Sequence, residues 1–127
     1  MRWHKIRTIL KMKRTVLIVD DEIDLCVLIK NYLGKKDCQV YIAHSLQEGI
    51  RKLETIKTDV LFLDNNLPDG TGWKEAQNIH SRFPDLHINL MSAVTNALAA
   101  PVKTGIPFTF RILEKPMKLS DMEDYLG

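Results

Sequence analysis

The stretch that decides the fold lies near the start of the chain and reads Val16-Leu17-Ile18-Val19-Asp20-Asp21-Glu22. Four apolar residues in succession are followed at once by three acids. A run that is apolar at every position, rather than at alternate positions, is typical of a strand covered on both faces of a parallel sheet. The stretch therefore predicts a buried parallel strand whose carboxyl end carries acidic side chains.

Four later runs of the same kind occupy residues 40–43, 60–63, 88–91 and 108–113. Between them, apolar residues at helical spacing predict helices over 25–33, 46–53 and 73–83, and a short last helix over 120–126. Gly34 is expected to stop the first helix, and Ser45 with Glu48 to form a capping box for the second. This alternation predicts an α/β fold, a doubly wound five-stranded parallel sheet with helices on both faces.

One segment breaks the alternation. Residues 93–107 stand where a further helix is due, but they contain Pro101, Gly105 and Pro107. Proline inside a helix removes a hydrogen bond and clashes with the preceding turn. We expect at most one or two helical turns there.

The charge is unevenly distributed along the 127 residues. The formal net charge is +2, yet residues 1–14 hold six basic side chains and no acid, and residues 15–127 hold the other twelve basic and all sixteen acidic ones. We expect a flexible basic N-terminal arm, 1–14, and one folded domain, 15–127. An arm that binds nucleic acid or an acidic surface, and a true start at Met12, remain alternatives.

Composition excludes several classes of protein. No apolar run approaches the ~18–20 residues that span a bilayer, and the basic N-terminus is not followed by the apolar region of a signal peptide. Two cysteines without an export signal indicate reduced thiols in the cytoplasm. Cys26 falls in a helical apolar pattern and is expected to pack in the core.

Polar residues end four of the five predicted strands. They are Asp20 and Asp21, Asp64, Ser92 and Lys115. Ligands of open parallel sheets bind at the carboxyl ends of the strands. Three carboxylates repel one another unless a cation joins them, and a hard divalent ion such as Mg²⁺ suits all-oxygen sites and leaves room for phosphate oxygens. The set predicts a site for phosphoryl chemistry.

Within this set, Asp64 is the best candidate for a nucleophile, because it ends the central strand. A phosphatase or phosphotransferase with an aspartate nucleophile is the competing interpretation. Such an enzyme usually has a second aspartate two residues on, where this chain has Asn66, and a capping module for which the chain has no room.

Four motifs together resemble a known family. They are residues 16–22, residues 63–70 (Leu63-Asp64-Asn65-Asn66-Leu67-Pro68-Asp69-Gly70), residues 91–93 and residues 113–116. In order and spacing they are similar to the receiver domain of bacterial two-component response regulators, over about residues 13 to 126. The resemblance implies a flavodoxin-like three-layer sandwich with strand order 2-1-3-4-5, and a cis peptide before Pro116.

The resemblance also implies a role for each site residue. Asp64 would be the phosphoacceptor, with Ser92 and Lys115 contacting the phosphoryl group. Asp20, Asp21, Asp64 and the backbone carbonyl of Asn66 would bind Mg²⁺.

The implied function is a cytoplasmic signalling switch, not an enzyme acting on other substrates. The phosphoryl donor would be a sensor histidine kinase or phosphotransfer protein, and the partner a downstream protein effector or an excised output domain, with no direct DNA or membrane binding by this chain. A degenerate receiver that binds partners without phosphorylation is the alternative.

The chain departs from the family pattern in its output region. The family commonly has an aromatic residue three positions before the lysine, where this chain has Ile112. The segment 93–107 is a poor helix, as noted above. We therefore expect output to run through rearrangement of residues 93–107.

Overall fold

Strand β1, Arg14–Val19, pairs with a neighbouring strand on each side. The computed structural model describes residues 13–93 and 110–127. Strand β2 (Cys38–Ala43) lies along one side of β1 and β3 (Val60–Asp64) along the other, followed by β6 (His87–Ser92) and β7 (Arg111–Glu114), all parallel. The order β2-β1-β3-β6-β7 is the predicted 2-1-3-4-5 order.

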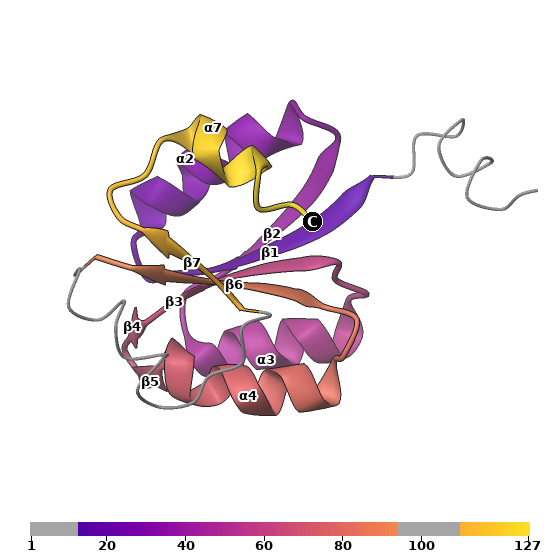
Figure 1. Ribbon diagram of the computed structural model, residues 1–127, viewed down its shortest axis with the longest axis vertical. Helices are drawn as coiled ribbons and strands as arrows, with labels where there is room; N and C mark the ends of the chain where they lie inside the picture. The colour runs from indigo at the N-terminus through magenta and orange to yellow at the C-terminus, as the bar shows by residue number, and fades with distance from the viewer. Residues whose placement is uncertain (1–12, 94–109) are drawn as a thin grey trace, which may run out of the picture.

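Helices cover both faces of this sheet, which makes three layers (Figure 1). Helices α2 (Ile23–Gly34) and α7 (Leu119–Glu123) lie on one face. Helices α3 (Leu46–Thr55) and α4 (Gly72–Arg82) lie on the other. The predicted flavodoxin-like sandwich is therefore confirmed.

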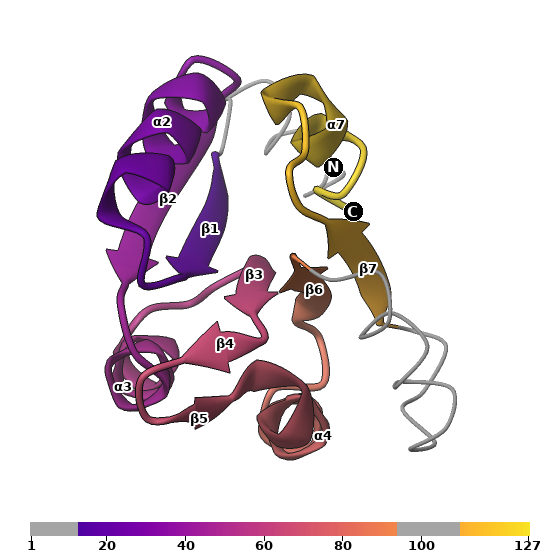
Figure 2. The same cartoon turned by 90° about the vertical axis from the view of Figure 1, so that its left-hand side faces the viewer.

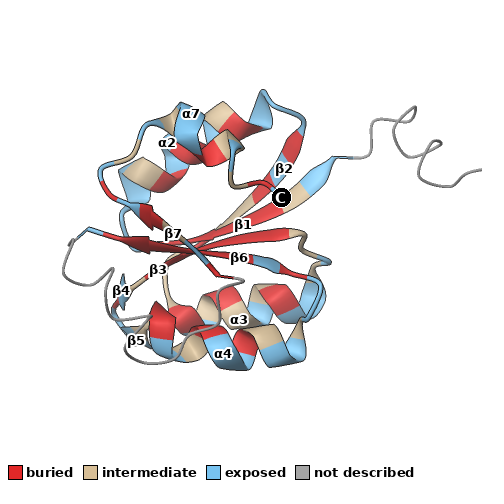
Figure 3. Cartoon of the chain, viewed as in Figure 1, coloured by how far each residue is buried: buried red, intermediate tan, exposed pale blue. Residues whose placement is uncertain are grey.

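The continuous apolar runs are explained by two cores, one on each face of the sheet. Side chains alternate between the faces along a strand. Leu17, Leu61 and Leu90 thus pack beneath α3 and α4, while Ile18 and Phe62 pack beneath α2 and α7. The strand interiors are almost wholly buried (Figure 3).

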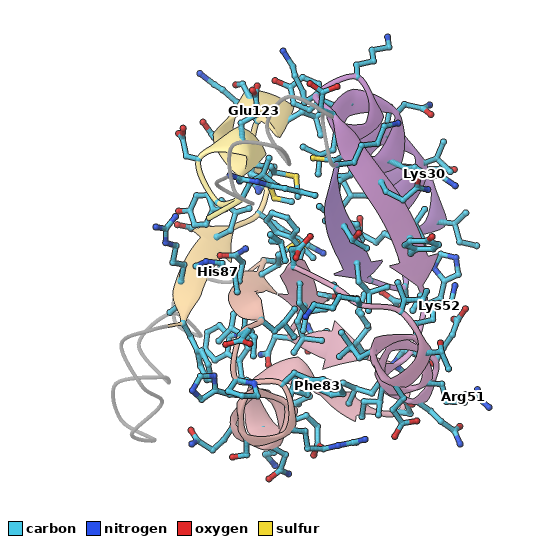
Figure 4. All side chains as sticks on the ribbon, turned by 90° about the vertical axis from the view of Figure 1, so that its right-hand side faces the viewer. Lys30, Arg51, Lys52, Phe83, His87 and Glu123 are labelled. Carbon is cyan, nitrogen blue, oxygen red and sulfur yellow. The ribbon has the colours of Figure 1, made fainter. Side chains whose placement is uncertain are left out.

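The last residues of the chain pack against the end of the sheet at which the parallel strands begin. The guanidinium of Arg14 donates to the Leu126 carbonyl at 2.6 Å, and the buried amide of Asn89 donates to the Tyr125 carbonyl at 2.8 Å. Phe83 and His87 lie at this end of the sheet (Figure 4), where a pocket of about 350 Å³ opens between the ends of α3 and α4. That pocket is remote from the acidic carboxyl ends of the strands.

Some element boundaries differ from those expected. Gly34 is the last residue of α2 rather than the residue after it, and the left-handed conformation is adopted by Asp37, with φ of 61°. The Ser45 hydroxyl does accept from the Glu48 amide, but the Glu48 carboxylate accepts from the amide of His44 instead of that of Ser45. The last helix is short, as predicted, and ends at Glu123.

Two short strands, β4 (Asn66–Leu67) and β5 (Gly70–Thr71), form a small antiparallel hairpin after β3 that was not predicted. The peptide before Pro116 is cis, as expected. Ile112 is half-buried on β7 and packs against the core beneath α3 and α4. Residues 94–107, the largest part of the segment expected to carry output, lie outside the described residues.

Candidate functional site

The candidate site lies at the carboxyl edge of the sheet, where β1, β3 and β6 end side by side (Figure 2). Asp20 follows β1, Asp64 is the last residue of β3, and Ser92 is the last residue of β6. Lys115 follows β7 directly, and its amide donates to the Ser92 carbonyl at 2.7 Å. The parallel topology therefore brings residues from four strands to one edge.

Three of the predicted acids form a tight cluster. Carboxylate oxygens of Asp20, Asp21 and Asp64 lie within 4.8 Å of one another. Asp20 is fully buried, Asp64 is almost so, and Asp21 is exposed. Carboxylate oxygens at this spacing, with one member open to solvent, match what a hard divalent cation requires.

Lys115 is the cation that the site supplies itself. Its ammonium lies 2.6 Å from Asp20 Oδ2 and 3.4 Å from Asp64 Oδ1. A third carboxylate, from Glu22, accepts from the same ammonium at 3.2 Å. Burial alone would lower the pKa of this lysine, but the hydrogen bond and charge of Asp20 outweigh burial and raise it, so the side chain stays charged.

The pKa of the Asp64 carboxyl is raised, whereas a carboxyl that only forms an ion pair with a cation has a lowered pKa. Burial, with repulsion from Asp20 next, raises its pKa from 3.8 to about 6. Attraction to Lys115 and a hydrogen bond from the Asn66 amide offset part of this rise. The protein alone therefore leaves excess negative charge in the pocket, and the residues fit Mg²⁺, which would neutralise it.

The backbone around the site is fixed by bonds between strands and loops. The Asn65 amide donates to the Met91 carbonyl, and the Gly72 amide to the Asn65 carbonyl, both at 3.0 Å. A Cβ on Gly72 would lie 2.2 Å from the Asp64 carbonyl oxygen, so glycine alone lets α4 begin this close to β3.

The Asp20 carbonyl accepts from the Cys26 thiol at 3.3 Å and lies 2.9 Å from Nδ1 of His44. Cys26 is buried in the core beneath α2, as predicted. No role is predicted for His44 from the sequence. Its position beside Asp20 depends on the pairing of β2 with β1, which spacing alone does not reveal.

The predicted site residues are thus mostly brought together. Asp20, Asp21, Asp64 and Lys115 converge directly, and Ser92 is buried at the end of the strand that pairs with β3. Asn66 is exposed and lies two residues beyond Asp64 in β4. The sequence predicts no role for Glu22, although it ends the motif 16–22, and none for Gly72, which lies two residues beyond the motif 63–70.

Comparisons with known proteins agree with this geometry. The family model of the response regulator receiver domain matches residues 16–126. The response regulator protein PilR of Pseudomonas aeruginosa is 28% identical over 115 residues, 91% of this chain but 26% of PilR. The chemotaxis protein CheY of Listeria monocytogenes is 29% identical over 80 residues, which is 62% of this chain and 67% of CheY.

Solved structures show the same fold. A two-component response regulator from Clostridium difficile superposes with a TM-score of 0.77 at 25% identity, over 88% of this chain and 91% of that one. This chain spans about a quarter of the length of PilR. In the described residues no helix has the length and apolar character needed to cross a membrane. Family match, topology and clustered acids lead to one conclusion: the chain belongs to the response regulator receiver domain family of two-component systems.

Proposed function

We propose that this receiver domain is a phosphorylation-dependent switch that takes a phosphoryl group onto Asp64. The observation that carries the proposal is the convergence of Asp20, Asp21 and Asp64 within 4.8 Å, with the Lys115 ammonium in contact with Asp20 and Asp64. A carboxylate of this kind is a competent nucleophile once the charge around it is balanced.

Mg²⁺ would be held by the carboxylates of Asp20, Asp21 and Asp64 and the backbone carbonyl of Asn66, and it would supply charge neutralisation of phosphoryl oxygens. An Asp64 oxygen attacks phosphorus and forms the new P–O bond. The bond from phosphorus to the leaving group breaks, and the leaving group departs with the electron pair. For a phosphohistidine donor, that group is the imidazole, which then takes up a proton.

Two side chains of the chain assist this transfer. The Lys115 ammonium lies beside Asp64 and is already desolvated, so it is placed to stabilise charge on the transferring oxygens. The hydroxyl of Ser92, at the end of the adjacent strand, is assigned a hydrogen bond to the phosphoryl group. No other substrate is turned over in this scheme.

The donor in this proposal is a sensor histidine kinase or a phosphotransfer protein, and the reader of the signal is an effector protein or output domain. The predicted receiver unit, 15–127, is extended by Arg14, because this residue pairs in β1 and its guanidinium donates to the Leu126 carbonyl; residues 1–13 are assigned to an arm outside the unit. The matched region covers 26% of PilR and 39% of the KDP operon transcriptional regulatory protein KdpE of Escherichia coli, so both regulators extend well beyond it. That relationship supports the assignment of output to another polypeptide or domain.

The test is incubation with acetyl phosphate and MgCl₂ followed by intact mass spectrometry. Wild type is expected to gain one phosphoryl group, Asp64→Asn none, and Asp85→Asn, which replaces an exposed acid away from the cluster, one. Omission of MgCl₂ should suppress the gain. Failure of wild type to be modified by acetyl phosphate, phosphoramidate or a phosphorylated histidine kinase would replace the proposal with a binding module that works without phosphorylation.

A further inference from the structure

Glu22 brings a fourth carboxylate to the site, and neither the metal cluster nor the phosphoacceptor role uses it. Its Oε1 accepts from the Lys115 ammonium at 3.2 Å, although the Glu22 side chain is 60% exposed. Asp20, the other hydrogen-bond partner of that ammonium, is wholly buried. Of the two carboxylates that accept hydrogen bonds from Lys115, Glu22 is therefore the one that faces solvent.

The position of Glu22 in helix α2 explains why its side chain is available. Glu22 is the N-cap residue, and its side chain makes no capping hydrogen bond. Its backbone is fixed on both sides, because the amide donates to Asp20 Oδ1 at 2.9 Å and the carbonyl accepts from the Cys26 amide at 3.1 Å. Serine, threonine, aspartate or asparagine would cap better here. The carboxylate is instead directed to Lys115.

The distances rank the contacts of the ammonium. Its nitrogen lies 2.6 Å from Asp20, 3.2 Å from Glu22 and 3.4 Å from Asp64. Asp20 and Glu22 accept hydrogen bonds from the ammonium, whereas Asp64 forms the longest of the three ion-pair contacts. A phosphoryl oxygen on Asp64 would compete with these carboxylates for the ammonium. The contact with exposed Glu22 is the one that water can most readily replace.

We infer that Glu22 is a positioning residue that restrains Lys115 on the Asp20 side of the pocket until a phosphoryl group competes for the ammonium. The inference rests on the proposed function, since it assigns a brake to the same site. In this arrangement Glu22 slows phosphoryl acceptance. Its charge also disfavours anionic donors, which acts in the same direction.

Two substitutions separate charge from shape. Glu22→Gln keeps the length and an acceptor oxygen but removes the charge, and Glu22→Asp keeps the charge. The interaction energy of an ion pair this exposed is small. Glu22→Gln should therefore accept the phosphoryl group of acetyl phosphate about two- to fivefold faster than wild type, at low ionic strength and saturating Mg²⁺. The advantage should fade in 0.5 M salt, which screens exposed charges. Glu22→Asp should stay closer to wild type.

Asp24→Asn is the matched control. Asp24 is exposed in the first turn of the same helix, so its replacement changes the net charge equally near the site. It should leave the rate within experimental error of wild type. An equal acceleration by Asp24→Asn would overturn the inference, because the effect would then be one of overall charge.

A second measurement does not depend on phosphorylation. In the unmodified protein, the ¹⁵N signal of the Lys115 ammonium should shift and its protons should exchange faster with water in Glu22→Gln but not in Asp24→Asn. An unchanged signal overturns the inference. If wild type is phosphorylated and Glu22→Gln is not faster, the brake alone is refuted. If wild type accepts no phosphoryl group from any donor, the proposed function fails and the brake fails with it.

Discussion

Replacement of Asp64 by asparagine should stabilise the metal-free protein at neutral pH. Asp64 is 5% exposed, and burial and the neighbouring Asp20 make its ionised form unfavourable. Asparagine has nearly the same shape but carries no charge. The substitution therefore removes the cost of burying a charge, and the repulsion from Asp20, which the folded state bears and the unfolded state does not.

The magnitude follows from the shift in pKa. The pKa of Asp64 rises from 3.8 to about 6 on folding. Each unit corresponds to ~1.36 kcal/mol, so ionised Asp64 opposes folding by about 3 kcal/mol at pH 7. Because the folded pKa lies above the unfolded one, this penalty is absent below pH ~4, grows as the pH rises through about 6, and is constant above.

Urea unfolding of wild type and Asp64→Asn, from pH 3.5 to 8, measures the difference. The variant should exceed wild type in free energy of unfolding by about 2–3 kcal/mol at pH 7 without Mg²⁺ and match it near pH 3.5. Mg²⁺ at 100 times its dissociation constant would add about 2.7 kcal/mol to wild type, so the gap should nearly close. Asp85→Asn should gain nothing. Equal or lower stability of Asp64→Asn at pH 7 would refute the reasoning.

Three further outcomes are expected elsewhere in the fold. Gly72→Ala should lower the free energy of unfolding by about 1–3 kcal/mol and the melting temperature with it, because its Cβ would lie 2.2 Å from the Asp64 carbonyl oxygen; an unchanged melting temperature would contradict this. Asp69→Ala should lose about 1 kcal/mol in urea unfolding at pH 7, since the Asp69 carboxylate accepts from two first-turn amides of α3 at 2.8 and 2.9 Å. The pKa of Asp69 is lowered by these bonds, so that loss should shrink as the pH falls below the ordinary pKa and disappear once the pH is below the lowered one. Burial raises the pKa of Cys26 to about 12, and its labelling by a thiol reagent should therefore track the rate of unfolding; rapid labelling of native protein would show that α2 opens locally.

The sheet was predictable because its strands are apolar on both faces. The run 60–63 is entirely buried in β3, and a continuous apolar run this short, bounded by polar residues, suits a strand better than a helix. Ends were less predictable, since β1 starts at Arg14 and β2 at Cys38, where backbone pairing continues beyond the apolar residues. The β4–β5 hairpin consists of two residues on each side, too short for any periodicity to show.

The candidate site was predictable to the extent that strand ends determine it. Asp20, Asp64 and Lys115 converge because parallel strands end at one edge, and that is a property of topology. The partners of Lys115 are a property of side-chain geometry. Whether Glu22 would cap α2 or contact Lys115 depends on rotamers and on distances of a few tenths of an ångström, which no spacing encodes.

Strand topology and side-chain geometry together determine how the carboxylates are arranged around Lys115. The carboxylates that topology gathers raise the pKa of Asp64 and leave the pocket short of positive charge. Lys115 supplies one charge and contacts three carboxylates with it, so the unmodified site is held by a shared cation. A divalent cation and a phosphoryl group would change that sharing together, because the metal takes up the carboxylates while phosphoryl oxygens compete for the ammonium. The contacts of Lys115 are therefore the local feature through which phosphorylation would act on β7, the strand that Lys115 directly follows.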